Sequence, residues 1–353
     1  MIYPAPNSSV PIAITKVDLG STKAQPLVRS AASLRLKTFP PLEYIVPPFV
    51  VPGCTVLAGN PKIGKSWLSL DAGLATASGG YCLGDKKCKQ GDVLFLALED
   101  NERRLQSRIT KILGCFDGEW PARFEYATEW PRAKQGGLDQ IRAWIERAKE
   151  PALVVVDVLA MFRSARLDTQ TSYDGDYEAL KGLQQIASDS NVAILVTHHL
   201  RKGAAEGGDP FERVSGTLGL TGAADSAAIL ARDSNGTTLY CRGRDIEEIE
   251  AAVQFDRTRC RWTILGDAAD VRRTDERTRI INALRDSGDE MSPTELASIT
   301  NMPSGNIRQL LLKLVKAGEI DKTGRGRYRA PAAPSHPPNI DNKITNSRIH
   351  HDG

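Results

Sequence analysis

A glycine-rich segment near residue 60 constrains the fold of this chain more than any other feature. It matches G-x-x-x-x-G-K-[ST] at every fixed position, follows the strand-like run VLAG, and continues into the helical pattern SWLSLDAGLATA. In this motif, backbone N–H groups surround a phosphate at a helix N-terminus, where the helix dipole favours anions. A chance glycine-rich turn would not explain the strand and helix on either side. The predicted nucleotide-binding residues are Gly59, Asn60, Pro61, Lys62, Ile63, Gly64, Lys65, Ser66 and Trp67.

Two residues of this loop and one distant acid are predicted to hold the phosphates and a metal ion. Lys65 is expected to reach the β- and γ-phosphates, and the Ser66 hydroxyl to ligate Mg²⁺. Asp157 ends the apolar run LVVVD, which makes it the natural second metal-binding residue, acting through water. Val158 follows it, so the second acid that commonly activates water at this place is missing. The catalytic base is therefore expected elsewhere.

Glu99 is the candidate base. It ends the run LFLALE, the strand candidate that follows the phosphate-loop helix, near the point where ligands bind sheets of this type. The alternative is that Glu99 caps the helix predicted from DNERRLQSRI, but Asp100 is available for that role. The catalytic role is favoured because the acid follows a buried strand that faces the loop.

A threonine and two histidines, Thr197, His198 and His199, end another strand candidate. A neutral histidine or a threonine at a strand tip can hydrogen-bond a γ-phosphate and report its loss to the following loop. His198 is favoured as this sensor, and a purely structural role is the alternative. The N-K-x-D pattern of guanine recognition and the signature LSGGQ are both absent, so ATP is the predicted nucleotide.

Short apolar runs alternate with helical patterns from Val46 onward. The runs are nearly continuous, as in strands covered on both faces of a parallel sheet, and comprise residues 54–59, 92–99, 151–158 and 192–199. The helical patterns comprise residues 65–76, 102–113, 138–149 and 177–190. This alternation predicts an α/β fold with a mainly parallel central sheet. Three later runs, ending near Leu265, predict a closing antiparallel extension.

The remaining composition limits the class of protein. Residues 1–40 are predicted to be a flexible segment, 41–266 an ATPase domain, 272–330 a second domain, and 331–353 a disordered tail. Six cysteines are scattered without a C-x-x-C pair, which disfavours zinc and disulfides and predicts reduced thiols and a cytoplasmic location. No apolar run approaches the roughly 18 residues of a membrane span, and the N-terminus lacks a signal-peptide pattern.

The second domain is the basic part of the chain. Residues 272–329 hold 12 Lys and Arg against 8 Asp and Glu, which suggests a polyanionic partner. A helix at Glu276–Ser287, a capping box at Ser292 and Glu295, a third helix capped by Ser304, and a hairpin at the end together predict a winged helix. The second helix of the helix-turn-helix would present Asn306, Arg308 and Gln309 to the major groove of DNA. Arg325, Arg327 and Arg329 would lie along the DNA backbone. A winged helix that binds protein is the alternative.

Six segments together resemble the RecA-like ATPases of the plasmid replicative helicase RepA type, over about residues 40–265. They are GNPKIGKSW, LFLALEDNERRLQSRI, LVVVDVL, LVTHHLRK, VSGTLGLTGAADSAAIL and CRGRDIEE. The resemblance implies a homo-oligomeric ring, usually a hexamer, with the nucleotide between subunits. It also implies that Lys65 and Ser66 bind phosphates and metal, that Asp157 binds metal, that Glu99 is the base, and that His198 is the sensor.

The segment Arg242-Gly243-Arg244 resembles the basic-x-basic strand that ring ATPases insert into a neighbour's site, where an arginine neutralises transition-state charge. Arg244 is favoured because it begins the polar turn RDIEE, and a surface ion pair with Asp245 or Glu247 is the alternative. Two loops, residues 161–176 and 201–213, would face a central channel. Their basic residues, which would contact single-stranded DNA or remain solvated, are Arg163, Arg166, Arg201 and Lys202.

Together these features predict an ATPase motor of mobile-element DNA replication, in which a homo-oligomeric ring moves along DNA. A recombination mediator that hydrolyses ATP without unwinding is the first alternative. The second is a nucleotide-switched DNA-binding regulator, in which slow hydrolysis only changes affinity.

Overall fold

The computed structural model describes residues 28, 30–39, 41–114, 118–164, 172–199, 209–211, 222–233 and 236–331. It divides into a short unit, Met1–Pro41, and a large unit, Leu42–Gly353. In the short unit, helix α1 (Ala31–Arg35) starts at Ser30, whose side chain accepts a hydrogen bond from the Ser33 backbone N–H. Most of the predicted flexible segment and nearly all of the predicted disordered tail lie outside the described residues.

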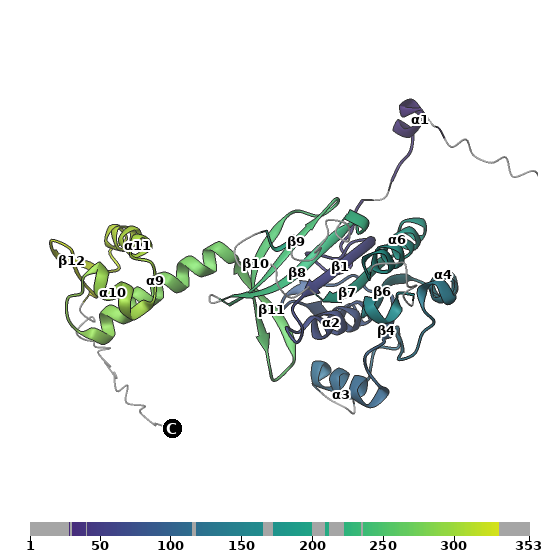
Figure 1. The fold of residues 1–353 in the computed structure, drawn as a ribbon, viewed down its shortest axis with the longest axis horizontal. Coiled ribbons are helices and arrows are strands. Elements are labelled where there is room, and N and C mark those ends of the chain that lie inside the picture. The colour runs from purple at the N-terminus through teal and green to yellow at the C-terminus, as the bar shows by residue number, and fades with distance from the viewer. Residues whose placement is uncertain are drawn as a thin grey trace, which may run out of the picture. The chain divides into compact units, whose positions relative to one another are not determined.

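The large unit is built around one sheet in which nine strands of the described chain lie in the order β11-β10-β9-β8-β1-β7-β6-β4-β5 (Figure 1). Strands from β8 to β5 pair in parallel, and strands from β8 to β11 pair antiparallel. The predicted α/β fold with a mainly parallel central sheet is confirmed. The strands are β1 (Gly53–Gly59), β4 (Asp92–Ala97), β5 (Phe124–Ala127), β6 (Pro151–Asp157), β7 (Ala193–His199), β8 (Ser226–Asp233), β9 (Gly236–Gly243), β10 (Ile249–Asp256) and β11 (Arg261–Asp267).

Helices cover both faces of this sheet. On one face, α2 and α3 bury apolar side chains such as Leu68 and Leu105 against alternate residues of the strands. On the other face, α4, α5 and α6 bury residues such as Trp144 and Leu183. The elements concerned are α2 (Lys65–Ser78), α3 (Glu102–Leu113), the 3-10 turn η1 (Ala133–Gln135), α4 (Gly137–Arg147), α5 (Leu159–Phe162) and α6 (Ser172–Ser190), with the small hairpin of β2 (Tyr81–Cys82) and β3 (Lys86–Lys87). Burial on both faces explains why the strand sequences are apolar without alternation.

The later strands differ from the prediction in one respect. The run that forms β8 was expected to begin an antiparallel extension, but β8 pairs in parallel with β1, from Thr55 opposite Ser226 to Gly59 opposite Leu230. Antiparallel pairing in this sheet begins between β8 and β9 and continues through β10 and β11. Parallel strands need a connection of a dozen or more residues, and 26 residues separate β7 from β8, whereas two to five residues separate each later pair of strands in this sheet.

The C-terminal residues form three helices and a hairpin around their own core. They are α9 (Ala268–Ser287), α10 (Pro293–Thr300), α11 (Ser304–Lys316), β12 (Asp321–Gly324) and β13 (Arg327–Arg329). The core includes Ile280, Leu296, Ile307 and Leu311, all fully or almost fully buried. This order of elements is the one expected of a winged helix, and its assignment as a separate domain remains a prediction.

Two details of this segment correct the prediction. Residues 267–271, which the sequence leaves between the two predicted domains, are helical from Ala268, because the Asp267 side chain caps α9 by accepting hydrogen bonds from the Ala269 and Asp270 N–H groups at 2.9 and 3.1 Å. The capping box of Ser292 and Glu295 is present, but α11 starts at Ser304 without a side-chain cap, since Pro303 occupies the cap position.

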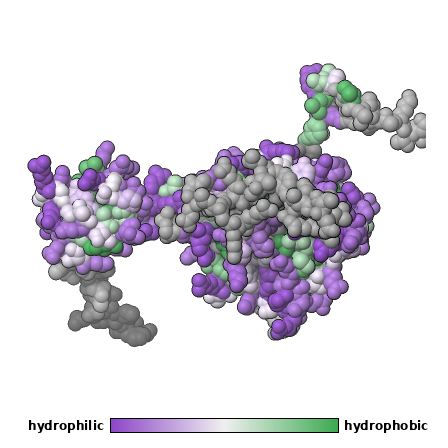
Figure 2. Space-filling view, viewed as in Figure 1, coloured by the Kyte–Doolittle hydropathy of each residue, from purple (hydrophilic) through white to green (hydrophobic). Residues whose placement is uncertain are grey.

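The face shown in Figure 2 is mainly hydrophilic, with small separated hydrophobic areas. No helix in the described parts of the chain has the length and apolar character needed to cross a membrane. Of the cysteines that the structure describes, Cys54, Cys82, Cys88, Cys241 and Cys260 are all unpaired and buried. Burial raises the pKa of the Cys88 and Cys241 thiols to about 12.

Candidate nucleotide-binding site

The predicted phosphate loop lies between the end of β1 and the start of α2. Gly64 is the N-cap residue of α2 and has a φ of 111°, a conformation that residues with a side chain rarely adopt. Gly59 is required for a different reason, because a Cβ there would lie 2.8 Å from the Leu230 carbonyl oxygen. The loop therefore has the strand, glycine and helix context that the sequence predicts for a phosphate-binding turn.

Lys65 is buried at the first position of α2. Its ammonium donates hydrogen bonds to the carbonyl oxygens of Gly59 and Asn60 at 2.9 and 3.1 Å, and to Nδ1 of His199 at 3.2 Å. Burial lowers the pKa of Lys65 to about 8, against the opposing charges of Asp157 and Glu99. A cation held beside a helix N-terminus is suited to binding a phosphate oxygen.

Ser66 and Asp157, the predicted metal pair, are in direct contact. The Ser66 hydroxyl donates to Oδ1 of Asp157 at 3.0 Å, and the Thr197 hydroxyl donates to the same oxygen at 2.6 Å. Burial raises the pKa of Asp157, and these two hydrogen bonds oppose that shift. A hydroxyl and a carboxylate at one point are hard oxygen donors, so the residues present fit Mg²⁺.

His199, the residue after the favoured sensor His198, contacts the phosphate loop. The two histidines are successive residues at the end of β7, opposite Ala58 and Gly59 of β1, so their side chains point to opposite faces. His199 shares a face with Thr197, which contacts Asp157. A charged lysine can only donate, so Nδ1 of His199 accepts and its Nε2–H is available as a donor. Burial and the Lys65 charge both lower the pKa of His199, which favours this neutral form.

Glu99 lies in the turn just after β4 and is exposed. Its charge acts on the pKa values of Lys65 and His199, so the three side chains share one electrostatic environment. The helix α3 that follows is capped by Asn101, whose side chain accepts from the Arg104 N–H at 2.9 Å. The sequence suggested Asp100 as the cap of this helix, but Asn101 has that role. Glu99 does not cap the helix either.

Asp100 instead belongs to a group of three charged residues that sequence reasoning missed. Its carboxylate forms ion pairs with Arg104, at 3.0 Å, and with Arg108. The Arg108 guanidinium lies over the ring of Trp67, with Cζ 4.7 Å from the ring centre. The Trp67 side chain thus connects the phosphate-loop helix to the turn that carries Glu99, and its own contact with a nucleotide remains a prediction. The Asp100 and Arg108 spacing of two helical turns was the available signal.

The two candidate finger arginines differ in how tightly they are held. Arg242 forms ion pairs with Asp209 at 2.8 Å and with Glu248, and stacks on the Phe211 ring at 4.3 Å. Arg244 follows β9 and its side chain is 65% exposed; the contacts of its guanidinium with described residues are long, 3.4 Å to Asp225 and to the Gly222 carbonyl. None of these three ion pairs among the described residues uses Asp245 or Glu247, the partners predicted from sequence. The exposed Arg244 is the side chain with more freedom to reach a neighbouring molecule.

The proposed channel loops fall mostly outside the described residues. Arg166, Arg201 and Lys202 are among those that the structure does not describe. Arg163 is described, and its guanidinium pairs with Asp176 of α6 at 3.3 Å. Its role in DNA contact therefore remains a prediction.

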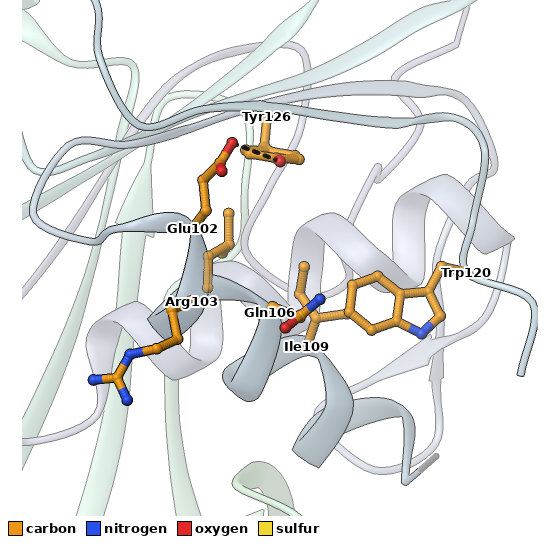
Figure 3. A pocket seen from close by; sticks show the side chains of 7 residues that line it. Glu102, Arg103, Gln106, Ile109, Trp120 and Tyr126 are labelled. Carbon is orange, nitrogen blue, oxygen red and sulfur yellow. Dashed lines mark hydrogen bonds between the residues drawn. The ribbon is translucent and has the colours of Figure 1, made fainter. Parts of the chain in front are cut away.

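A separate pocket of about 330 Å³ lies beside α3 and is not part of this site (Figure 3). Its lining includes Ile109 and Trp120, and the Tyr126 hydroxyl donates to the Glu102 carboxylate at 3.1 Å. No residue of the phosphate loop lines it. The chemistry thus gathers at the carboxyl ends of β1, β4, β6 and β7 rather than in this pocket, as expected for an open parallel sheet.

The fold and this site together define a P-loop domain of RecA-like topology, in which β7 separates the phosphate-loop strand β1 from the acid-bearing strand β6. A family described as "AAA domain" (AAA_25) matches residues 22–205, just over half of the chain. The chain therefore belongs to the AAA_25 family of AAA domains.

Individual relatives are more distant. The chain is 28% identical over 155 residues to "DNA repair protein RadA" of Streptococcus pneumoniae (strain ATCC BAA-255 / R6), covering 43% of this chain and 31% of that protein. RadA of Streptococcus pyogenes serotype M6 is 27% identical over 154 residues, covering 43% and 29%. The chain thus spans about a third of the length of these curated relatives.

Two solved structures are also similar. One is "ATPase Domain of G40P", with a TM-score of 0.48, 12% identity, and coverage of 61% of this chain and 85% of that chain. The other is "The Structure Of A DnaB-Like Replicative Helicase And Its Interactions With Primase", with a TM-score of 0.48, 11% identity, and coverage of 60% and 57%.

Proposed function

We propose that this protein is an ATP-hydrolysing RecA-like motor that acts on DNA, and specifically a RepA-type replicative helicase of a plasmid, phage or other mobile element. The single observation that carries the proposal is the meeting of Lys65, Ser66, Asp157 and His199 beside the phosphate loop, with the charge of Glu99 acting on the same group. These are the residue types that phosphoryl transfer to water requires.

Each residue has a distinct part in the proposed reaction. Lys65 neutralises charge on the β- and γ-phosphates, and the backbone N–H groups of the loop hold the phosphates in place. Ser66 and Asp157 would hold Mg²⁺, which neutralises charge on the phosphate oxygens. Glu99 orients a water molecule and accepts its proton. The Nε2–H of His199 binds the γ-phosphate and is released when that group leaves.

The proposed assembly is a homo-oligomeric ring, with a hexamer as the expected size. Arg244 of one subunit would complete the site of its neighbour, which its exposure permits. Single-stranded DNA would pass through the ring, and the basic C-terminal helices would contact duplex DNA or a protein partner.

A recombination mediator is the second candidate, and its support is the 28% identity to a protein named DNA repair protein RadA. A motor and a mediator share the ATPase site, so the site does not separate them. A nucleotide-switched regulator would use the same residues for slow hydrolysis.

ATP hydrolysis with and without single-stranded DNA tests the proposal, using wild type and Glu99→Gln. Strong DNA stimulation that Glu99→Gln abolishes is the expected result, and displacement of a labelled strand would then separate helicase from mediator. Slow hydrolysis that DNA does not affect would reject the motor and favour the regulator. Unchanged turnover in Glu99→Gln would show that another group is the base.

A further inference from the structure

We infer that Trp262 is a positioning residue for the phosphate loop, although it lies almost two hundred residues further along the chain. This inference rests on the proposed function, because it takes ATP as the ligand of the loop. The Trp262 indole N–H donates to the Gly64 carbonyl oxygen at 3.1 Å. The side chain is 1% exposed, so this contact is made away from water.

The geometry of one peptide group explains why this contact affects phosphate binding. The Gly64 carbonyl and the Lys65 N–H belong to the same planar trans peptide, so they point in opposite directions. A donor that holds the carbonyl therefore also fixes the direction of the Lys65 N–H, one of the groups that faces a bound phosphate in this motif. The same carbonyl accepts the first helical hydrogen bond, from the Leu68 N–H at 3.1 Å.

The indole also holds the loop by shape. A Cβ on Gly64 would lie 3.0 Å from Cζ2 and 3.1 Å from Nε1 of Trp262, so the ring occupies the space that a side chain would need. Phe255 of β10 packs against the indole, with ring centres 5.1 Å apart. Gly64 and Trp262 thus form a matched pair, in which the glycine admits the ring and the ring restrains the glycine.

A neighbouring ion pair anchors the strand that carries Trp262. The Arg261 guanidinium donates to the Asp71 carboxylate at 2.9 Å, and Asp71 is a buried residue of α2. Asp71 lies seven residues after Gly64, on the same side of α2. Strand β11 therefore contacts the phosphate-loop helix at two points on one face, which fixes the position of the indole relative to the loop.

Two substitutions of Trp262 separate the hydrogen bond from the packing. Trp262→Phe keeps a large ring but removes the donor. Trp262→His removes the larger ring, while its Nε2 occupies the position equivalent to the indole nitrogen and can donate. Phe255→Leu is the packing control, because it loosens the contact with the indole and leaves the donor in place.

Affinity for Mg–ADP, measured by calorimetry on the full chain, is the readout, with the KM and kcat for ATP and the melting temperature measured in parallel. Trp262→Phe is expected to weaken ADP binding and raise KM by about three- to tenfold, the effect of one lost hydrogen bond, with a smaller change in kcat. Trp262→His should bind ADP more tightly than Trp262→Phe even if it melts at a lower temperature. Phe255→Leu should lower the melting temperature while affinity stays near that of wild type.

Wild-type affinity in Trp262→Phe would overturn the inference and leave the proposed function intact. So would losses of affinity that follow melting temperature across all three variants, since Trp262 would then be purely structural. A wild-type protein that binds neither ADP nor ATP would reject the proposed function, and the inference would fall with it.

Discussion

Lys65 is a buried residue whose side chain carries a positive charge. Its ammonium is held by two loop carbonyls and His199, and burial lowers its pKa to about 8, whereas an unfolded lysine has a pKa of 10.5. Between these two pH values the unfolded chain binds more protons at this site than the folded chain. The free energy of unfolding should therefore increase as the pH rises from about 8 to 10.5. Below pH 8 the contribution of Lys65 to this free energy should be at its lowest.

The same pKa predicts the opposite trend for catalysis. Only the protonated Lys65 attracts phosphates. Because kcat/KM follows the ionisation of the free protein, kcat/KM for ATP should fall as the pH rises above about 8. Steady-state rates across this range measure the effect. Lys65→Arg, which stays charged, should be less active overall but show no inflection near this pH. A flat profile for wild type would contradict the prediction.

The two histidines give a matched pair of variants on one strand. His199→Ala removes the imidazole next to Lys65, and kcat should fall by about tenfold or more, as for loss of a transition-state donor. His198→Ala changes the side chain that points to the other face, so its effect on kcat should be much smaller. Single-turnover hydrolysis distinguishes the two. Equal losses would mean that the end of β7 acts only as a structural element.

At the scale of elements, the strands and helices of the sheet could be predicted because burial on both faces leaves nearly continuous apolar runs. The helix α3 was predicted at its observed bounds, and the residues Lys65, Ser66 and Asp157 were predicted as one site. The sequence favours His198 over His199 as the sensor without a physical basis for the choice, because a continuous apolar run does not show which residues point to which face of the sheet, and a shift of one residue exchanges the two faces.

Other features depend on contacts between distant elements. The parallel pairing of β8 with β1 joins segments that are far apart in the chain, and local sequence patterns do not encode such a pairing. The contact of Trp262 with Gly64 joins residues from β11 and the phosphate loop, and no local spacing indicates it. Local rules succeeded where one segment determines its own structure and failed where two segments determine it together.

Helix α10 offers a test of one such local rule. Ser292→Ala breaks the capping box, in which Ser292 and Glu295 satisfy each other's backbone N–H groups, and should lower the free energy of unfolding of this segment by about 1 kcal/mol. Ser304→Ala is the matched control, because Ser304 starts α11 without a side-chain cap. Its effect should be near zero. Denaturant unfolding followed by circular dichroism measures both, and equal effects would contradict the assignment.

At the scale of the whole molecule, the proposed ring makes each active site depend on two subunits. Arg244 is exposed and weakly held, whereas Lys65 is buried in its own subunit. If Arg244 acts on the neighbour's nucleotide, the two substitutions Lys65→Ala and Arg244→Ala damage different halves of the same site.

Mixing the two inactive variants tests this arrangement. An equal mixture of Lys65→Ala and Arg244→Ala should regain about a quarter of wild-type ATPase activity, because random assembly of a closed ring places an intact loop beside an intact arginine at that frequency. Each variant alone should remain inactive at the same total concentration. A mixture as inactive as its components would show that Arg244 acts within its own subunit or not at all.

The burial of the cysteines gives this protein an internal probe of opening motions. Cys54 and Cys241 lie in strands of the central sheet, and burial raises the pKa of both thiols. An alkylating reagent attacks the thiolate, so each of these positions reacts only during the moments when the surrounding strands separate. Their labelling rates therefore record how often the sheet opens, and a nucleotide that binds only the closed form would slow the labelling in proportion to its occupancy.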